Sequence, residues 1–193
     1  MKLGFDLDGV VFNSTPAFVA EGVRLGLIPP EVTAGDITHW DLGDQFGLQP
    51  EVACAMWAPE VYGRAVIYKE ALPALRKLKS MGAELWFITA RCGQFHDAEA
   101  VQEVTRAQLG QYGLLDGSNI IWSPTADKAA EVDRHKLDHY VDDHPLPIEL
   151  LYESGYQGAW LMARRWNENV YGLPRTNWHA YFQAVHALLK GAQ

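Results

Sequence analysis

Cysteines, basic clusters and long apolar runs are all scarce in this sequence of 193 residues. Its two cysteines, Cys54 and Cys92, are too few for a disulfide framework or a structural zinc site, so we expect a reducing, cytoplasmic environment. No apolar run approaches the roughly 20 residues that a membrane-spanning helix requires. The first twelve residues carry two acids and no small-residue cleavage site, so we do not expect a signal peptide.

Positive charge is also in short supply. The 16 lysines and arginines are outnumbered by 24 aspartates and glutamates, which gives a net charge of −8. Because no dense basic run is present, we expect neither a nucleic-acid duplex nor an anionic membrane as partner. A small phosphorylated ligand stays open, since it needs only local positive charge or a metal. A hydrophobic share of 48% excludes wholesale disorder, and the length suits one domain with at most a small insertion.

Short apolar runs alternate with helical patterns along most of the chain. Leu72, Leu75 and Leu78 recur at helical spacing and predict a helix that ends at Gly82. Similar patterns predict helices near 101–112, 126–136, 146–154 and 177–190, and the apolar runs predict strands at 3–5, 85–88, 119–122, 140–141 and 159–162. This alternation predicts a Rossmann-like α/β fold with three layers, in which helices cover both faces of a parallel sheet.

Residues 13–67 interrupt the alternation. They contain no convincing strand pattern and are punctuated by prolines and glycines, with Pro16 suited to the first turn of a helix and another short helix expected at 51–62. We therefore expect a small helical cap inserted after the first strand. Residues 1–12 and 68–193 then form the core domain.

Paired acids follow two of the predicted strands. Asp6 and Asp8 come after the first strand, and Asp142 and Asp143 come after the strand at 140–141. In parallel α/β sheets the ligand crevice lies at the carboxyl ends of the strands, and ionised groups beside apolar strands need a partner or a purpose. If these two strands are neighbours, all four acids fall within one site. Such an oxygen-rich cluster suits Mg²⁺.

Groups that suit phosphate lie near two further strand ends. The strand at 85–88 is followed by the hydroxyl of Thr89 and the small-residue backbone of Ala90, which can donate hydrogen bonds to phosphoryl oxygens. Lys128 stands at the start of the helix that precedes the second acid pair, where an ammonium group can offset clustered negative charge.

Taken in order, these motifs resemble those of the haloacid dehalogenase superfamily of phosphohydrolases. The segment Asp6-Leu7-Asp8-Gly9-Val10 matches the first motif, Thr89 the second, Lys128 the third and Asp142-Asp143 the fourth. Lys136 is a rival for the third role, but it lies only six residues before the acids. Family members more often leave a full helix between the lysine and the acids, which favours Lys128.

The resemblance implies a Mg²⁺-dependent phosphomonoester hydrolase that works through an aspartyl-phosphate. Asp6 would be the nucleophile, and Asp8 would protonate the leaving oxygen and then take a proton from water. The implied metal ligands are the Asp6 carboxylate, the Asp8 backbone carbonyl and an acid from the pair Asp142 and Asp143, whose direct ligand stays open. The threonine, alanine and lysine named above would hold the phosphoryl oxygens.

A narrower resemblance concerns the 5′(3′)-deoxyribonucleotidase branch and its bacterial and phage relatives. The segment Ala163-Arg164-Arg165-Trp166-Asn167 after the last strand and the small cap are similar to that branch, although Ala90-Arg91 stands where the animal enzymes carry Ser-Pro. The implied substrates are deoxyribonucleoside monophosphates. The alternatives are a phosphatase for another metabolite such as a sugar phosphate, and a noncatalytic member that binds nucleotide or a partner protein. A further alternative, a polynucleotide 3′-phosphatase, would need a basic groove, and the sequence does not indicate one.

Aromatic residues of the expected cap offer faces on which a base can stack. These residues are Trp40, Phe46, Trp57 and Tyr62. The alternative is that they form the cap's own core, since a helical insertion has to bury apolar surface. Arg91, next to the phosphate motif, is expected to support loop structure or bind anions.

Overall fold

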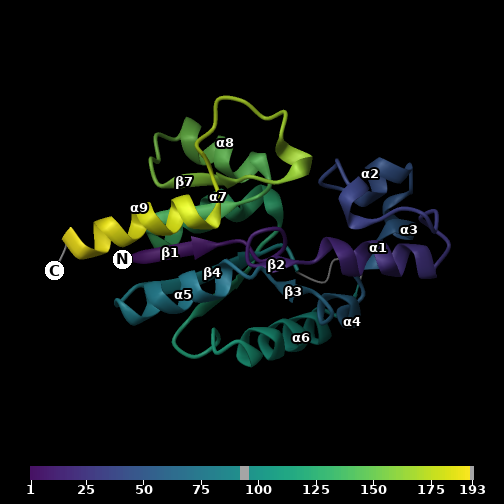
Figure 1. Ribbon diagram of the computed structural model, residues 1–193, viewed down its shortest axis with the longest axis horizontal. Coiled ribbons are helices and arrows are strands. Elements are labelled where there is room, and N and C mark those ends of the chain that lie inside the picture. Colours follow the sequence, from purple (N-terminus) through teal and green to yellow (C-terminus); the bar gives the residue numbers. More distant parts are fainter. Residues whose placement is uncertain (92–95, 192–193) are drawn as a thin grey trace.

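The computed structural model describes residues 1–91 and 96–191, and a six-stranded sheet forms its centre (Figure 1). The sheet order is β5-β4-β1-β6-β7-β8, and every neighbouring pair of strands is parallel. The strands are β1 (Lys2–Phe5), β4 (Glu84–Thr89), β5 (Asn119–Trp122), β6 (His139–Asp142), β7 (Ala159–Met162) and β8 (Arg175–Thr176). The first strand therefore lies inside the sheet, between β4 and β6.

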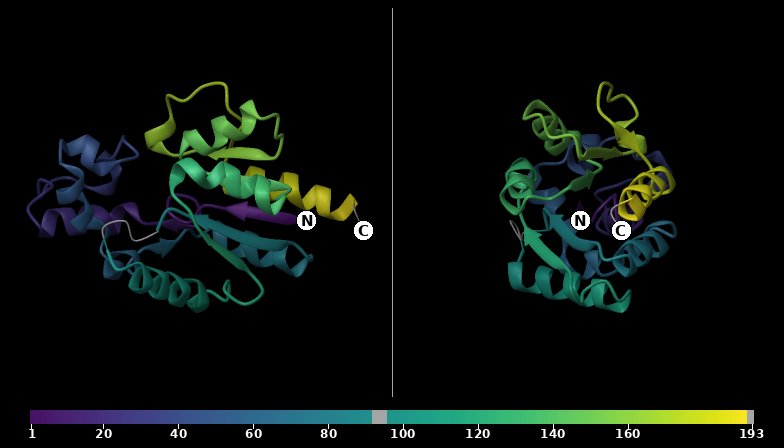
Figure 2. Two further views of the ribbon diagram at one scale, coloured as in Figure 1. Left: turned by 180° about the vertical axis from the view of Figure 1, so that it is seen from behind. Right: turned by 90° about the vertical axis from the view of Figure 1, so that its left-hand side faces the viewer.

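Helices lie on both faces of the sheet (Figure 2). They are α5 (Ala71–Ser80), α6 (Ala98–Gln111), α7 (Lys128–His135), α8 (Pro145–Glu153) and α9 (Trp178–Gly191). Buried residues of α5 and α9 share one core cluster with Leu109 of α6, whereas α7 and α8 pack in a second cluster. The predicted three-layer parallel α/β fold is confirmed.

Successive side chains of the strands enter these two clusters in alternation. Leu3 and Phe5 lie in the cluster of α5 and α9, where Phe5 stacks on Trp178 at 5.6 Å between ring centroids. Ile88 and Tyr140 belong to the cluster of α7 and α8. Because both faces are buried, the strands are short continuous apolar runs, and this explains why all five strands expected from the sequence are present.

A helical segment lies between β2 (Phe12–Asn13) and β3 (Val66–Ile67), which pair in an antiparallel ribbon. It holds α1 (Thr15–Arg24), α2 (Leu42–Phe46), α3 (Pro50–Ala53) and α4 (Pro59–Tyr62), with 3-10 turns at Ala34–Asp36 and Cys54–Trp57. Val19, Ile28 and Met56 form part of its own small core. The chain thus leaves and re-enters the core through one ribbon, and the segment projects from one end of the molecule (Figure 1).

Two local expectations differ from the structure. The single helix expected at 51–62 is divided into α3, a 3-10 turn and α4, because Pro59 disfavours helical backbone at Ala58, whose φ of −58° and ψ of 151° are extended. The two-residue strands β2, β3 and β8 were not expected, since two residues carry no periodicity. Cys92 lies outside the described residues. Within the described ranges, no helix is long and apolar enough to cross a bilayer.

Candidate active site

Three buried carboxylates meet at the carboxyl ends of β1 and β6. Asp6 follows β1, Asp142 is the last residue of β6, and Asp143 follows it. Since the two strands are neighbours, one oxygen from each carboxylate lies within 4.8 Å of the others. Asp8 faces the same cavity but is not part of this group, because its carboxylate is paired with Arg91.

Lys128 is the cation of this carboxylate cluster. It begins α7, and its buried Nζ donates to Oδ1 of Asp6 at 2.6 Å and to Oδ2 of Asp142 at 3.0 Å. Burial lowers the pKa of Lys128, but the two carboxylates outweigh burial and hold this pKa above its ordinary value. Lys136, the rival, is an exposed residue with φ of 52° that ends α7. The structure therefore brings Lys128, and not Lys136, to the acids.

Asp142 is fully buried and its two oxygens are both engaged. Oδ1 accepts a hydrogen bond from the backbone N–H of His144 at 2.9 Å. Oδ2 accepts from Lys128 and, at 2.5 Å, from the hydroxyl of Tyr140. These contacts fix the carboxylate rigidly at the floor of the site.

Asp143 is held differently. Its Oδ2 accepts from the indole Nε1 of Trp166 at 2.7 Å, and its backbone carbonyl accepts from Asn167 at 2.8 Å. Within the described ranges, no hydrogen bond is recorded at Oδ1. Asp143 therefore offers an oxygen that accepts no hydrogen bond from the described residues, whereas each oxygen of Asp142 already accepts at least one.

The charge of the cluster fits a divalent cation. If all three buried carboxylates are ionised, they share one ammonium group, and two negative charges would be uncompensated where water is largely excluded. Burial raises the pKa of Asp6 well above its ordinary value, and burial together with Asp142 raises the pKa of Asp143 to about 7. Hard carboxylate oxygens with excess negative charge are the donor set that Mg²⁺ prefers.

Gly9 allows the loop after β1 to press against the acids. Its φ is +78°, and an added Cβ would lie 2.3 Å from Oδ2 of Asp143. The backbone carbonyl of Gly9 accepts from Nε of Arg164 at 2.5 Å. A side chain at this position would therefore push the loop away from the carboxylate cluster.

The expected phosphate motif at the end of β4 is only partly directed at the cavity. Ala90 and Arg91 line the cavity, whereas Thr89 is buried and is not among its lining residues. The Thr89 hydroxyl accepts from the backbone N–H of Arg91 at 3.3 Å and so organises the turn. A direct contact of Thr89 with phosphate stays a prediction.

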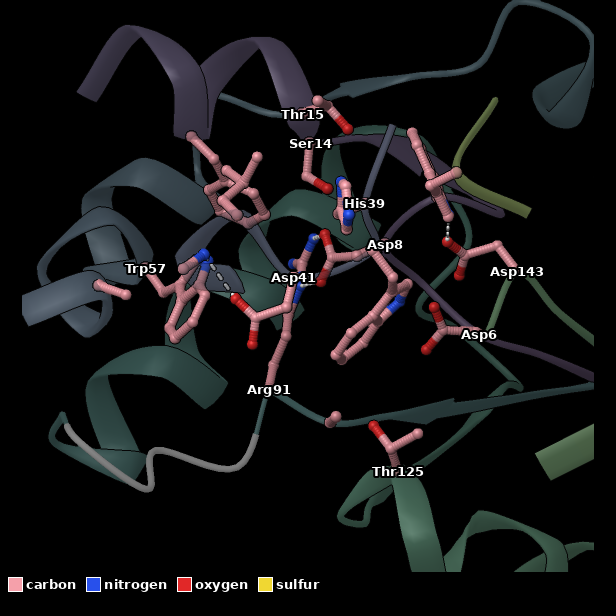
Figure 3. A pocket seen from close by; sticks show the side chains of 18 of the residues that line it. Asp6, Asp8, Ser14, Thr15, His39, Asp41, Trp57, Arg91, Thr125 and Asp143 are labelled. Atoms are coloured by element: carbon pink, nitrogen blue, oxygen red, sulfur yellow. Dashed lines mark hydrogen bonds and ion pairs between the residues drawn. The ribbon is translucent and has the colours of Figure 1, made fainter. Parts of the chain in front are cut away.

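A cavity of about 500 Å³ extends from the acids to the helical segment (Figure 3). Trp40, Trp57 and Tyr62 line it, so three of the four aromatic residues singled out from the sequence reach the site. Phe46 does not line the cavity and packs against the core of the helical segment. The Trp40 ring is 46% exposed and meets the ring of His144 edge-on at 4.3 Å.

The charged groups on the cavity wall are unevenly distributed. The helical segment contributes two carboxylates, Asp41 and Asp44. The lining cations Lys128 and Arg91 are both buried and already paired with carboxylates of the core. Among the described lining residues, no lysine or arginine is left for a second anionic group of a ligand.

Several supporting residues were not singled out from the sequence. They are Tyr140, which bonds Asp142, and Thr105 and Gln108, which bond Arg91. Each belongs to an apolar strand or an amphipathic helix, where its side-chain type is unremarkable. The sequence signal that leads toward them is indirect: Arg91, which two of them bind, lies two residues after the strand-end Thr89.

Solved structures that share this architecture include phosphatases and a HAD-superfamily hydrolase. A protein of Clostridium acetobutylicum named as a "predicted phosphatase" superimposes with a TM-score of 0.62 at 14% identity, covering 99% of this chain and 97% of that one. A HAD-superfamily hydrolase from Geobacter sulfurreducens gives 0.59 at 16% identity, covering 97% and 95%. The D,D-heptose 1,7-bisphosphate phosphatase of B. bronchiseptica, solved with magnesium and phosphate, gives 0.54 at 14%, covering 97% and 99%. The fold is thus that of haloacid dehalogenase superfamily phosphatases.

The name of one curated relative points to one class of phosphatase, the nucleotidases. A protein of Oceanobacillus iheyensis, "Putative nucleotidase OB0422", is 26% identical over 191 residues, which covers 95% of this chain and 98% of that protein. No family model matches the chain.

Proposed function

We propose that the protein is a Mg²⁺-dependent phosphomonoester hydrolase that works through an aspartyl-phosphate on Asp6. The observation that carries the proposal is the carboxylate cluster at the cavity floor, where Lys128 binds Oδ1 of Asp6 at 2.6 Å. Within the described residues no hydrogen bond is recorded at Oδ2 of Asp6, so this oxygen is available to attack phosphorus. The fold and the name of the curated relative support the same chemistry.

The chain would supply the nucleophile, the proton carrier and three ligands of the metal. A bound Mg²⁺ would neutralise the repulsion between the Asp6 carboxylate and an anionic phosphate. We assign it to the carboxylates of Asp6 and Asp143 and to the backbone carbonyl of Asp8, because Asp143 keeps one oxygen open while both oxygens of Asp142 are engaged. Lys128 and the backbone after Thr89 would hold the phosphoryl oxygens, and Asp8 would carry the proton.

For the substrate we propose a nucleoside monophosphate, selected by residues 13–67 acting as a cap. The cavity volume of about 500 Å³ lies within the range of small-molecule sites, and Trp40 and Trp57 offer aromatic faces to a base, whereas the Tyr62 ring lies against the Arg91 guanidinium. The carboxylates of Asp41 and Asp44 favour a leaving group with hydrogen-bond donors. Of the lining residues that the structure describes, the lysine and arginine that a second phosphate or a carboxylate on the leaving group would meet, Lys128 and Arg91, are already paired with carboxylates.

A panel of phosphate esters tests this proposal. With Mg²⁺, we expect kcat/KM for deoxyribonucleoside monophosphates to exceed that for 2-phosphoglycolate and for sugar bisphosphates by at least about 10-fold, since an unpaired buried charge costs more than 1.4 kcal/mol. Chelation by EDTA should abolish phosphate release, and Mg²⁺ should restore it. Equal or faster hydrolysis of 2-phosphoglycolate or sugar bisphosphates would agree with the proposed phosphatase activity but contradict the proposed nucleotide substrate. Release from no ester at all would favour a noncatalytic binding protein.

Trp40 and Phe46 provide a matched pair for the base-stacking role. We expect Trp40→Ala to raise KM for nucleoside monophosphates by about 5-fold to 100-fold, the cost of losing one aromatic–base contact. Phe46→Ala removes a ring that packs in the cap core away from the cavity, so it should lower the melting temperature without changing substrate preference. Glycerol phosphate, which has no base, is the reference ester. A Trp40 variant with unchanged preference across these esters would count against stacking.

A further inference from the structure

The Asp8 carboxylate forms an ion pair with the buried Arg91. Nε of Arg91 donates to Oδ2 at 2.7 Å and Nη2 donates to Oδ1 at 2.6 Å, so the pair is bidentate. The Arg91 side chain is 1% exposed, whereas that of Asp8 is 27% exposed and lines the cavity. A bidentate contact fixes the plane of a carboxylate as well as its position. Each oxygen keeps a further lone pair that can face the cavity.

Arg91 is itself held from every side. Its remaining terminal nitrogen, Nη1, donates to Gln108 Oε1 at 3.0 Å and to Thr105 Oγ1 at 3.3 Å, both on α6. Its guanidinium carbon lies 4.6 Å from the ring centroid of Tyr62 and 5.4 Å from that of Phe12. With donors and ring contacts arranged in this way, the guanidinium has little freedom to bind a free anion. It is placed as a support for Asp8.

The same network reaches the point where the chain returns from the cap. Nε2 of Gln108 donates to the carbonyl oxygens of Tyr62 at 3.0 Å and Ala65 at 2.7 Å. Tyr62 ends α4, and Ala65 directly precedes β3. One glutamine side chain therefore binds both the arginine that holds Asp8 and the backbone that leaves the cap.

We propose that Arg91 is a positioning residue that fixes the Asp8 carboxyl group for proton transfer, and that Gln108 ties this position to the returning cap segment. The role rests on the proposed phosphatase function. As the Asp6 carboxylate bonds to phosphorus and the bond to the leaving oxygen breaks, protonated Asp8 gives that oxygen its proton. When water attacks phosphorus in the aspartyl-phosphate, the Asp8 carboxylate takes a proton from the water. The bond between phosphorus and the Asp6 oxygen breaks, so that phosphate leaves and the Asp6 carboxylate is regenerated.

Two esters whose leaving groups differ in their need for a proton can show whether Arg91 positions Asp8 for proton transfer or only supports the fold. An alkoxide leaves poorly unless it is protonated, whereas p-nitrophenolate leaves as a stable anion. The parameter kcat/KM covers only the steps up to departure of the leaving group. We expect Arg91→Met to lower kcat/KM for a nucleoside monophosphate by about 100-fold, the usual contribution of a general acid, but for p-nitrophenyl phosphate by less than about 5-fold.

Two further variants and one control keep the test decisive should Arg91→Met fold poorly. Arg91→Lys retains the charge without the bidentate fork and should give an intermediate loss, about 10-fold, again confined to the nucleotide. Gln108→Leu should likewise lower kcat/KM for the nucleoside monophosphate more than kcat/KM for p-nitrophenyl phosphate. Arg106→Met replaces an exposed arginine of α6 outside this network and should match wild type.

The outcomes distinguish this role from the proposed function. Equal losses on both esters in folded Arg91→Lys or Gln108→Leu would make Arg91 a structural residue and overturn the proposal. Unchanged rates on both esters would overturn it as well. If wild type releases phosphate from neither ester, the proposed phosphatase function fails first and the role of Arg91 falls with it.

Discussion

Replacing Asp6 with asparagine is expected to lower kcat/KM for every phosphate ester by at least about 10⁴-fold, the scale on which a lost nucleophile is measured in other covalent enzymes. An amide cannot form the acyl-phosphate, so no slower version of the same pathway remains. The substitution keeps the shape of the side chain, and its carbonyl oxygen can still accept from Lys128. Rapid acid quenching with phosphate-labelled substrate should leave label on wild type and none on Asp6→Asn.

Asp133→Asn is the matched control, because Asp133 is an exposed residue of α7 and the chemical change is the same. It should label and turn over as wild type does. Both variants should retain a cooperative thermal transition near that of wild type. Labelled protein in the Asp6 variant, or turnover close to the wild-type rate, would refute the covalent mechanism proposed for Asp6.

The parts of the site that the sequence predicts are those fixed by local chain geometry. Asp6 follows β1 and Asp142 is the last residue of β6, and the carboxyl ends of adjacent parallel strands must share one edge of the sheet. Lys128 is placed by the helix that it begins. The strand and helix periods place each residue on its element, because buried parallel strands appear as continuous apolar runs. The periods do not show that β1 and β6 are neighbours, and the choice of Lys128 over Lys136 came from the family resemblance.

The partners of these residues depend on contacts that no local pattern encodes. Arg91 and Asp8 are 83 positions apart, and the sequence gives no reason for the guanidinium to turn toward Asp8 and not toward a ligand. Trp166 illustrates the same limit, since its indole donates to Asp143 while its ring packs against the core of the helical segment. The helical segment itself was harder to predict, because its helices α2, α3 and α4 have only four or five residues and offer too few turns for a periodic signal.

The contrast between Asp142 and Asp143 also emerges only from tertiary contacts. In sequence the two acids are equivalent neighbours. In the fold Asp142 accepts from Tyr140 and Lys128, whereas Asp143 accepts from a single indole. Asp142 is thereby suited to hold the lysine in place, and Asp143 is suited to present an oxygen to a metal.

Replacing Lys128 with methionine is expected to reduce both activity and stability. The variant leaves three buried carboxylates without their cation, and removal of one partner from a buried ion pair typically costs about 3–5 kcal/mol of unfolding free energy. Loss of a phosphoryl-binding charge should lower kcat by about 100-fold or more. Urea denaturation and initial rates measure the two effects separately.

Mg²⁺ gives this prediction a sharper form. Once the ammonium is gone, a divalent cation becomes the main source of positive charge for the acids, so added Mg²⁺ should stabilise Lys128→Met more than it stabilises wild type. Lys136→Met is the matched control, because Lys136 is the exposed rival at the other end of α7. That control should keep wild-type activity and the wild-type response to Mg²⁺. A larger activity loss at Lys136, or stability of Lys128→Met that is insensitive to Mg²⁺, would contradict the charge balance assigned to the carboxylate cluster.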